Sequence, residues 1–540
     1  MAMAKDGGKE RARMRRGMAW RMIAALILFG AGYAVANRFQ LVHSVAYRLA
    51  ADDRASAVTA FLFLSLQALV LAAALLLFPR RWAAVLLALA GVSIFASLSY
   101  GQIVRELIDG GILAWMLGEA RLAGAAAGEF GGDILSVVGQ LVGALLLLVA
   151  ARRVARGAAA MPWSPGIAAA TLAALVTPSI LYRHLELWPE GAERVLYGAA
   201  WEVAAAPPPP PRAAPTLFPD RAAAVPRHIV WLIDESVAAA PFARIVKPRL
   251  ANIAHRDFGV AAALGHCSAP AQIALRSGVD VRRAGPTTDL RRTPSIWGYA
   301  RRAGYRTVMI DGQTSGAPQN MMLPPERALI DMFAAMPGGI DTDLRIADRL
   351  NAAMRGPGKS FTIAVLRGVH FQYRDHYPPG AIPADSPVAV QYDTALKWSK
   401  ARFFERLLAG VDRGAVAVVY TSDHGQNLAS GALPHCSRDA VADEFRVPLI
   451  AFLPPALAAR YVDAPRRGHS VSQIFPATLG WMGYDPARAA ALYDADLTAP
   501  TARYVWFDRN AVPLRAGGTI GITAGPDFPG TSAGRKTGPD

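Results

Sequence analysis

The sequence predicts an N-terminal α-helical membrane domain with five spans, followed by a C-terminal α/β domain with a mainly parallel central sheet. Long apolar stretches without interior charge predict the first part, because each is close to the ~17–25 residues that a helix needs to cross a bilayer. Short apolar, β-branched runs alternate with helical patterns from His228 onward and predict the second part. With 540 residues, the chain is also too long for one ordinary hydrophobic core.

The basic charge balance fits a membrane protein better than a nucleic-acid binder. The net charge is +16 and the pI is about 10.1. Much of the positive charge lies in the N-terminus and in short arginine clusters between apolar runs, and it forms no recognisable nucleic-acid motif. We therefore expect a membrane environment and no nucleic-acid partner.

Apolar stretches predict the membrane spans. The basic start of the chain, 1–18, also fits the first region of a cleaved signal peptide, but the further apolar stretches favour a multi-pass protein. Buried helices of a soluble core are the other interpretation, and the length of the uncharged stretches argues against it. The five predicted spans are Trp20–Ala36, Ala57–Phe78, Trp82–Tyr100, Ile134–Ala151 and Trp163–Tyr182.

The positions of the arginines predict the orientation. The N-terminus, the Pro79–Arg81 turn and the Arg152–Arg156 turn are basic, and five crossings place all three on one side. Because basic loops stay in the cytoplasm, the N-terminus is predicted there and everything after Tyr182 outside it. The apolar segment Leu107–Leu122, in the second outer loop, fits either a helix in the membrane interface or a plain loop helix.

Composition predicts the remaining boundaries. The Pro207–Pro211 run favours a semi-rigid extended spacer, and the Gly-, Pro-, Ser- and Thr-rich C-terminus favours a disordered tail. The predicted parts are a basic N-terminus (1–18), a transmembrane domain (19–182), a Pro-rich linker (183–227), the α/β domain (228–510) and the tail (511–540).

The α/β domain is predicted from strand-like runs and the helical stretches between them. The strand candidates are His228–Ile233, Tyr305–Ile310, Phe361–Leu366, Ala415–Tyr420 and Val447–Phe452. The helix candidates are Ser295–Ala303, Leu344–Met354 and Val388–Leu408.

The stretch Ala415–Gly425 carries the first chemical signal. Its apolar run ends abruptly in Thr-Ser-Asp-His-Gly, which places Asp423 and His424 at the end of a buried strand. Open α/β sheets bind ligands at the carboxyl ends of their strands, and a carboxylate beside an imidazole suits zinc or a similar divalent ion. For this motif alone, a surface Asp-His pair at the start of a loop is the alternative.

Other strand ends supply matching groups. The first strand ends in Asp234-Glu235-Ser236, the third leads to His370, and His435 lies in the loop after the fourth. Singly, each fits a structural role, such as a helix N-cap or a hydrogen-bonded loop residue. Together they indicate a hydrolytic or transfer site with one or two metal ions.

Ser268 stands before a short helical stretch in the segment Gly265–Gly278. A hydroxyl at this position can reach a metal ion while the helix N–H groups face an incoming anion. An ordinary N-cap serine is the alternative.

These motifs make the chain resemble the phosphoethanolamine transferases of the alkaline phosphatase/sulfatase superfamily, over about Trp20–Gly483. Proteins of this family have five N-terminal spans in the inner membrane and a periplasmic catalytic domain. The family's Gly-Glu-Thr/Ser after its first strand resembles Asp234–Ser236, and its Thr-Ser-Asp-His-Gly-Glu strand end resembles Thr421–Gln426. Its nucleophilic threonine, just after a cysteine-containing turn, resembles Ser268.

Further matches and several departures accompany this resemblance. The family's Ser-His-Gly-Pro segment before Tyr-Pro-Pro resembles His370–Pro379, its Leu-His-Gly histidine resembles His435, and its helix-opening Tyr-Asp-Asn-Thr resembles Tyr392–Thr394. The departures are Asp234 for glycine, Ser268 for threonine, and Gln426-Asn427 for Glu-Ser. In addition, His370 lies one residue nearer to Tyr-Pro-Pro than in the family, and the chain has two cysteines where many relatives have several disulfides. The Ser268 segment also resembles the sulfatase signature, in which serine or cysteine becomes formylglycine, but Gln272 stands where sulfatases have arginine.

The resemblance implies an alkaline-phosphatase-like α/β fold and a zinc site of one or two ions. The implied metal ligands are Glu235, Ser268, Asp423 and His424, with Ser268 as the nucleophile. The implied role of His370 and His435 is to bind a second ion, or to stabilise phosphate charge and protonate the leaving group.

The implied reaction transfers phosphoethanolamine, or a related phospho-headgroup, through a covalent phosphoserine. The expected donor is a phospholipid such as phosphatidylethanolamine, and the expected acceptor is lipid A or an envelope glycan. The implied location is the bacterial inner membrane, with the catalytic domain in the periplasm. The alternatives are a sulfatase, a phosphodiesterase, a phosphoglycerol transferase, or a membrane-tethered binding protein without activity.

Cys267 and Cys436 are the only two cysteines. They are too few for a disulfide-stapled scaffold or a Cys-rich zinc site. Both lie in the domain placed in the oxidising periplasm, and each adjoins a proposed site residue, Ser268 or His435. A disulfide between them is one interpretation, and two unrelated buried thiols are the other.

Overall fold

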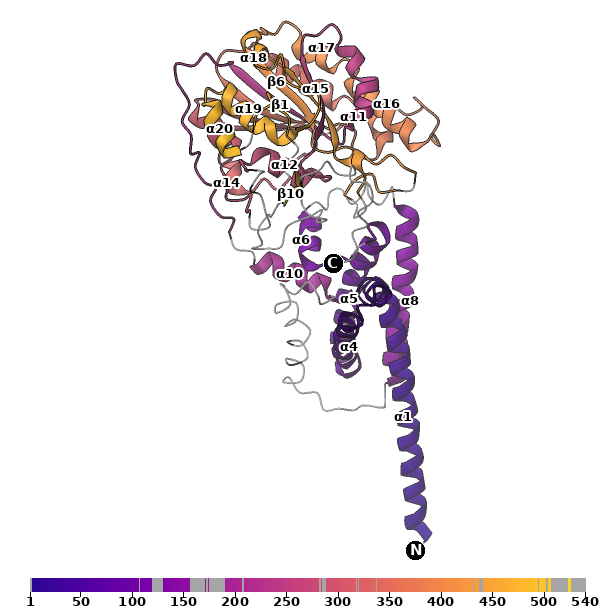
Figure 1. The fold of residues 1–540 in the computed structure, drawn as a ribbon. Coiled ribbons are helices and arrows are strands. Elements are labelled where there is room, and N and C mark those ends of the chain that lie inside the picture. Colours follow the sequence, from indigo (N-terminus) through magenta and orange to yellow (C-terminus); the bar gives the residue numbers. More distant parts are fainter. Residues whose placement is uncertain are drawn as a thin grey trace. The chain divides into compact units, whose positions relative to one another are not determined.

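The computed structural model describes most of the chain (Figure 1). The described residues are 2–105, 107–118, 130–155, 190–205, 208–280, 288–316, 320–336, 338–430, 432–436, 440–493 and 495–501, the single residues 170, 173, 283 and 318, and two short strands, 504–506 and 523–525. The chain divides near Pro207 into a helical unit and an α/β unit.

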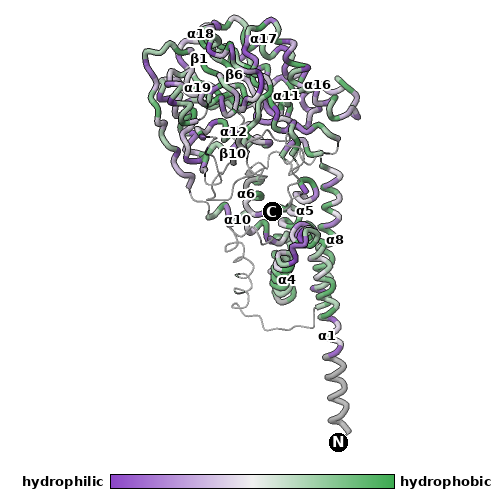
Figure 2. The backbone as a smooth tube through the Cα atoms, in the orientation of Figure 1, coloured by the Kyte–Doolittle hydropathy of each residue, from purple (hydrophilic) through white to green (hydrophobic). Residues whose placement is uncertain are grey.

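The helical unit contains four helices that are long and apolar enough to cross a membrane. Within α1, α4, α5 and α8, the qualifying segments are Arg16–Ala36, Arg54–Leu76, Arg80–Ile103 and Gly131–Ala155. The helices of this unit are α1 (Ala2–Ala36), α2 (Arg38–Leu41), α3 (Tyr47–Ala50), α4 (Arg54–Leu77), α5 (Arg80–Ile103), α6 (Gly110–Gly118), α8 (Gly131–Ala155) and α10 (Val195–Ala205), with a π-helical turn at Val42–Ala46. In Figure 2 the tube is mostly green, the colour of hydrophobic residues, along α4.

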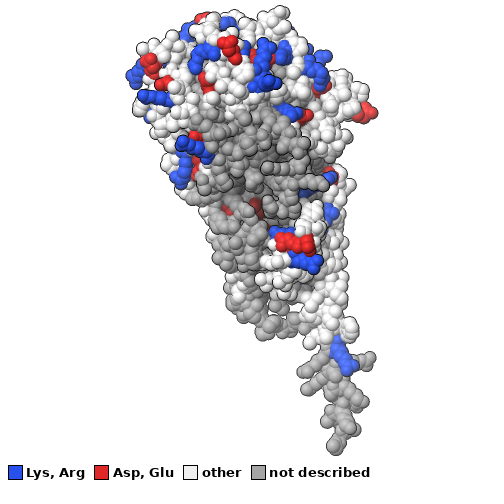
Figure 3. Space-filling model, in the orientation of Figure 1, with Lys and Arg blue, Asp and Glu red and all other residues white. Residues whose placement is uncertain are grey.

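The predicted count of five spans is one more than the described residues contain. The predicted span Trp163–Tyr182 lies outside the described residues, apart from residues 170 and 173, so only the first four predicted spans have a matching helix. The segment Leu107–Leu122 is described in part, and α6 forms its middle. On the face drawn in Figure 3, charged side chains gather over the α/β unit, and the described part of the helical unit is largely white.

The α/β unit is built on an eight-stranded mixed sheet. Its order is β4-β3-β5-β1-β6-β7-β2-β8. The strands are β1 (His228–Asp234), β2 (Arg256–Ala262), β3 (Arg306–Asp311), β4 (Met332–Ala335), β5 (Ser360–Val365), β6 (Val416–Ser422), β7 (Arg446–Phe452) and β8 (His469–Ser470). Strand β7 runs antiparallel to both β6 and β2, and the other pairings are parallel. The predicted α/β fold with a mainly parallel sheet is therefore confirmed.

Helices cover both faces of the sheet because alternate residues of each strand point to opposite sides. On one face, Val230 and Leu232 of β1 join a buried cluster with side chains of the helices α11, α15, α16 and α17. On the other face, Trp231 packs edge-on against Phe361 and donates a hydrogen bond to Thr478 of α19. The helices of this unit are α11 (Ala239–Ile245), α12 (Ser268–Arg276), α13 (Ile296–Arg302), α14 (Pro324–Arg327), α15 (Thr342–Arg355), α16 (Val388–Lys400), α17 (Phe403–Leu408), α18 (Pro455–Ala459), α19 (Ile474–Trp481) and α20 (Pro486–Tyr493).

The sheet order brings the predicted chemistry together. Strand β1 lies between β5 and β6, and all three are parallel, so their carboxyl ends meet at one edge. The register pairs Asp234 of β1 with Ser422 of β6 and Ile233 with Val365 of β5. The residues that follow these strands therefore begin side by side, which is where open α/β sheets bind their ligands.

Candidate active site

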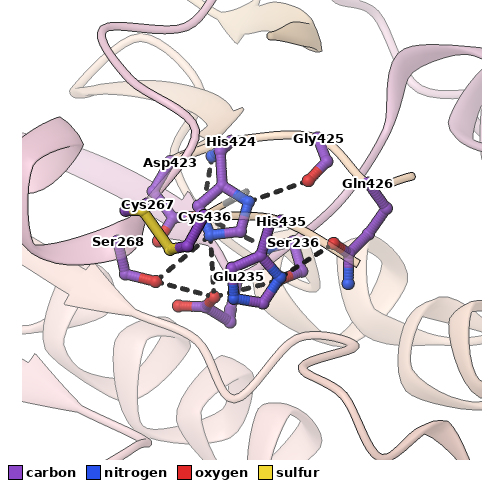
Figure 4. The surroundings of a disulfide bond; sticks show 10 residues. All are labelled: Glu235, Ser236, Cys267, Ser268, Asp423, His424, Gly425, Gln426, His435 and Cys436. Carbon is purple, nitrogen blue, oxygen red and sulfur yellow. Dashed lines mark hydrogen bonds and ion pairs between the residues drawn. A yellow bond between two sulfur atoms is a disulfide. The ribbon is translucent and has the colours of Figure 1, made fainter. Parts of the chain in front are cut away.

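Glu235, Asp423 and His424 form a compact buried cluster at the carboxyl ends of β1 and β6 (Figure 4). One potential ligand atom from each residue lies within 4.8 Å of the others. The Nε2 atom of His424 is 3.4 Å from Glu235 Oε1 and 3.9 Å from Asp423 Oδ1. Two carboxylates and one imidazole are a donor set that suits zinc or a similar divalent ion.

Backbone groups orient these side chains. The Nδ1 atom of His424 lies 2.8 Å from the carbonyl oxygen of Gly425, so Nδ1–H donates and Nε2 is the ring nitrogen that faces the cluster. Asp423 Oδ1 accepts the backbone N–H groups of Ser236 at 3.2 Å and His424 at 2.8 Å. The carbonyl-bound histidine is the arrangement by which proteins fix the tautomer of a metal-binding imidazole.

The electrostatics of the cluster call for a cation. Burial and the Glu235 carboxylate raise the pKa of Asp423 to about 7. Burial alone would lower the pKa of His424, but Asp423 and Glu235 outweigh it and raise that pKa to about 9. Burial alone would raise the pKa of Glu235, but the hydrogen bond and charge of His424 hold it well below its usual range. The residues present therefore fit a bound divalent ion, which would replace the imidazolium as the counter-charge of the carboxylates.

Ser268 places its hydroxyl against this cluster from the first residue of α12. Its Oγ lies 3.0 Å from Glu235 Oε1 and 3.2 Å from His424 Nε2. The side chain is partly exposed, unlike the cluster behind it. Ser268 is also the first residue of this helix, and the unpaired N–H groups of a helix N-terminus favour anions.

A disulfide joins the segment that carries Ser268 to the loop that carries His435. Cys267 is bonded to Cys436, with their Cα atoms 5.1 Å apart (Figure 4). The predicted bridge is thereby confirmed.

His370 and His435 lie beside the cluster rather than in it. The ring centroids of His424 and His435 are 4.4 Å apart, and those of His370 and His435 are 5.6 Å apart. The side-chain amide of Gln426 is 3.0 Å from His435 Nδ1 and 3.0 Å from the hydroxyl of Tyr373. The structure thus brings all the predicted site residues into one region, with His370 at its exposed side.

Ser236 and Ser422, the other serines beside the cluster, have structural contacts. Ser236 is fully buried, has a positive φ of 63°, and donates its hydroxyl to Glu235 Oε1 at 3.0 Å. Ser422 is fully buried and receives the backbone N–H of Val237 at 2.8 Å. Neither hydroxyl is open to a substrate, which leaves Ser268 as the accessible oxygen.

Two glutamines support the carboxylates. Gln272 of α12 donates to Asp423 Oδ2 at 3.2 Å, at the position where the sulfatase signature has arginine. Gln313 donates to Glu235 Oε2 at 2.7 Å and to the carbonyl of Leu366 at 3.0 Å. Sequence reasoning missed Gln313, although its place two residues after β3 is a strand-end signal of the same kind as the others.

Comparisons with known proteins agree with this fold. The sulfatase family model matches residues 248–484. The chain is similar to the integral membrane protein lipooligosaccharide phosphoethanolamine transferase A from Neisseria meningitidis, with 14% identity, a TM-score of 0.53, and coverage of 89% of this chain and 97% of that one. No curated protein matches the sequence significantly.

The chain is also similar to structures of a periplasmic domain. The C-terminal periplasmic domain of EcEptC from Escherichia coli shares 16% identity with this chain at a TM-score of 0.45, covering 56% of this chain and 96% of that one. A second structure of that domain, in complex with Zn, shares 16% identity at a TM-score of 0.44, covering 53% of this chain and 91% of that one.

The site lies in the α/β unit that contains the match to the sulfatase family model, and apolar N-terminal helices precede this unit in the chain. The chain as a whole has the fold of a membrane-bound phosphoethanolamine transferase.

Proposed function

We propose that this protein transfers phosphoethanolamine, or a related phospho-headgroup, from a phospholipid to an envelope acceptor through a covalent phosphoserine at Ser268. The observation that carries the proposal is the position of the Ser268 hydroxyl, 3.0 Å from Glu235 Oε1 and 3.2 Å from His424 Nε2. An accessible hydroxyl against a buried donor set of two carboxylates and an imidazole is the arrangement that an activated serine nucleophile requires.

The expected metal is zinc, and one or two ions would bind. Glu235, Asp423 and His424 would hold the first ion. When bound, it would lower the pKa of the Ser268 hydroxyl and offset negative charge on the phosphate. Gln272 holds Asp423 by a hydrogen bond to Oδ2, and Gln313 holds Glu235 by a hydrogen bond to Oε2, the oxygen that leaves Oε1 for Ser268. Such supporting bonds orient ligands and tune their basicity.

In the first half-reaction, Ser268 Oγ attacks the phosphorus of the donor headgroup. The Oγ–P bond forms as the bond from phosphorus to the diacylglycerol oxygen breaks. Ser268 loses its proton and the departing diacylglycerol oxygen gains one. His370 and His435 lie beside the cluster, so they are placed to supply that proton, to bind the phosphate oxygens or to hold a second ion.

In the second half-reaction, a hydroxyl of the acceptor attacks the phosphoserine. The Oγ–P bond breaks, the acceptor hydroxyl gives up its proton, and Ser268 is restored with one. The expected donor is phosphatidylethanolamine, and the expected acceptor is lipid A or an envelope glycan. Apolar helices in the same chain suit this reaction, because donor and acceptor are both anchored in or near a bilayer.

We place the protein in the bacterial inner membrane, with a cytoplasmic N-terminus and a periplasmic catalytic domain. The basic N-terminus and the arginines of the Pro79–Arg81 and Arg152–Arg156 segments support this orientation.

Mass spectrometry of lipid A and envelope glycans tests the function. Cells that express the wild-type protein are expected to show the added phosphoethanolamine group. Ser268→Ala abolishes the transfer while keeping the fold, because only the oxygen that carries the intermediate is lost. Ser386→Ala, which changes a serine before α16, serves as the control and leaves the transfer intact.

Two outcomes would contradict the proposal. Near-normal transfer by Ser268→Ala would exclude Ser268 as the nucleophile. Formylglycine at position 268, found in the intact mass of the wild-type protein, would identify a sulfatase instead.

A further inference from the structure

A buried lysine lies behind the metal cluster. Lys400, the last residue of α16, has a side chain that is fully inaccessible to solvent. Its Nζ lies 2.8 Å from Asp234 Oδ2 and 2.7 Å from Asp343 Oδ2, and both carboxylates are buried as well. Burial alone would lower the pKa of Lys400, but the two carboxylates outweigh it and raise that pKa, so the ammonium stays charged. A buried ammonium between two buried carboxylates is costly to form unless every member is paired.

The first carboxylate connects Lys400 to the metal cluster. Asp234 immediately precedes Glu235, and its Oδ1 accepts the backbone N–H of Glu235 at 3.1 Å. Its backbone carbonyl accepts the N–H of Asp423 at 3.0 Å. Tyr420 donates its hydroxyl to Asp234 Oδ2 at 2.5 Å. Asp234 therefore touches the backbone of two proposed ligands while its side chain is held by Lys400.

The second carboxylate connects Lys400 to the turn that leads to His370. Asp343, in the first turn of α15, accepts the backbone N–H of Arg367 at 2.8 Å and that of Gly368 at 3.2 Å. Ser399 also donates to Asp343 Oδ2, at 2.6 Å. Asp343 thus fixes the backbone of the segment just before His370.

These two connections meet at Gly368. A Cβ atom at this glycine would lie 2.4 Å from the carbonyl oxygen of Glu235 and 2.7 Å from Asp234 Oδ1. The φ of Gly368 is +60°, a conformation that other residues rarely adopt. The next residue, Val369, donates its N–H to the carbonyl of Glu235 at 3.1 Å. The turn and the end of β1 are therefore in close backbone contact. Lys400 binds Asp234, which lies at the end of β1, and Asp343, which accepts the N–H groups of the turn.

We propose that Lys400 is a positioning residue for the metal site: its ammonium holds Asp234 and Asp343 together, and through them it fixes Glu235 against the turn that leads to His370. The inference rests on the metal site proposed above. It assigns to Lys400 a role in the geometry of the ligands, beyond a contribution to the stability of the core.

The test is the zinc affinity of the full chain, purified in detergent, stripped of metal and titrated with zinc against a chromophoric chelator. Lys400→Met keeps the length of the side chain and removes its charge. We expect its zinc affinity to fall by about 10–100-fold, the usual cost of losing a group that orients metal ligands. The matched control is Lys397→Met, an exposed lysine on the same helix, which leaves the affinity unchanged.

The melting temperature, measured with and without zinc, separates positioning from stability. A purely structural lysine would lower the melting temperature of both forms and leave the zinc affinity as in the wild type; that result would overturn the inference. If Lys400→Met does not fold, Asp343→Asn carries the test, because it removes the charge that faces Lys400 and leaves one oxygen where two now accept the N–H groups of Arg367 and Gly368. Wild-type zinc affinity in folded Asp343→Asn would equally overturn it.

The same titration distinguishes this inference from the proposed function. A wild-type protein that binds no zinc would refute the metal site itself and the role of Lys400 with it. Zinc binding that is insensitive to Lys400→Met and Asp343→Asn would refute the role of Lys400 alone.

Discussion

His376 is a histidine whose surroundings disfavour its charged form. It lies in the short helical turn Tyr373–His376 and is 5% exposed. Burial, followed by the charges of Arg367 and His370, lowers its pKa from 6.5 to about 3. The folded protein therefore keeps this imidazole neutral at pH values where the unfolded chain protonates it.

This difference predicts a pH dependence of stability. The contribution of the neutral His376 to the free energy of unfolding is fully present above pH 6.5. It is lost as the pH falls from 6.5 toward 3, because the unfolded state takes up the proton first. The loss is about 1.4 kcal/mol for each pH unit in this window. We expect wild-type protein to lose more stability than His376→Asn between pH 7.5 and pH 5.5. Parallel melting curves for the two proteins across this range would contradict the prediction.

Single residues also show what the sequence reveals about the site. Asp423 and His424 were predicted because they come at the end of a recognisable buried strand. Glu235 also follows such a strand, but its role as a ligand was implied by the family resemblance. Gln313 was missed because its contact with Glu235 depends on the order β3-β5-β1, a long-range feature that no local pattern encodes. Lys400 was missed because a lysine at the end of an amphipathic helix is ordinarily solvent-exposed, and only the tertiary fold buries this one.

At the scale of elements, the disulfide connects two segments that are 169 residues apart in sequence. Cys267 precedes α12, and Cys436 follows His435 and donates its backbone N–H to the carbonyl of His266 at 3.0 Å. The bond therefore fastens the loop of His435 to the start of the helix that carries Ser268. Cross-links that close long loops stabilise a protein mainly by restricting its unfolded state.

Reduction of this bond should lower both stability and activity. We expect a loss of about 2–4 kcal/mol, read as a lower melting temperature in the presence of a phosphine reductant. The double variant Cys267→Ser/Cys436→Ser is the control, because the reductant should leave its melting temperature unchanged. Titration of the denatured, unreduced wild-type protein should find no free thiol, and two thiols per chain would exclude the bridge.

The predicted strands and helices differ from the observed ones in two places: one strand begins with polar residues, and one long predicted helix is divided in two. All five predicted strands lie in the sheet, because each is an apolar run long enough to stand out. Strand β2 was missed because it starts with Arg256-Asp257 and its register shifts between Asp257 and Gly259. The predicted helix Val388–Leu408 is two helices, because the chain turns after Lys400 to bury Phe403 and Leu407.

At the scale of the whole molecule, the number of crossings decides where the catalytic domain works. Four crossings, as in the described residues, return the chain at Ala155 to the side on which it started. The catalytic domain lies on the opposite side only if one further crossing occurs between residues 156 and 189. The predicted span Trp163–Tyr182 falls in that interval.

Labelling of introduced cysteines in spheroplasts with a membrane-impermeant maleimide tests this arrangement. The two native cysteines are bonded to each other, so they do not react with the label. We expect Asp412→Cys, on the surface of the catalytic domain, and Asp52→Cys, between α3 and α4, to be labelled in intact spheroplasts. Arg81→Cys, at the start of α5, should react only after lysis, because basic loops stay in the cytoplasm. If Asp412→Cys also needed lysis while Asp52→Cys did not, the number of crossings would be even, and the domain would have no access to periplasmic acceptors.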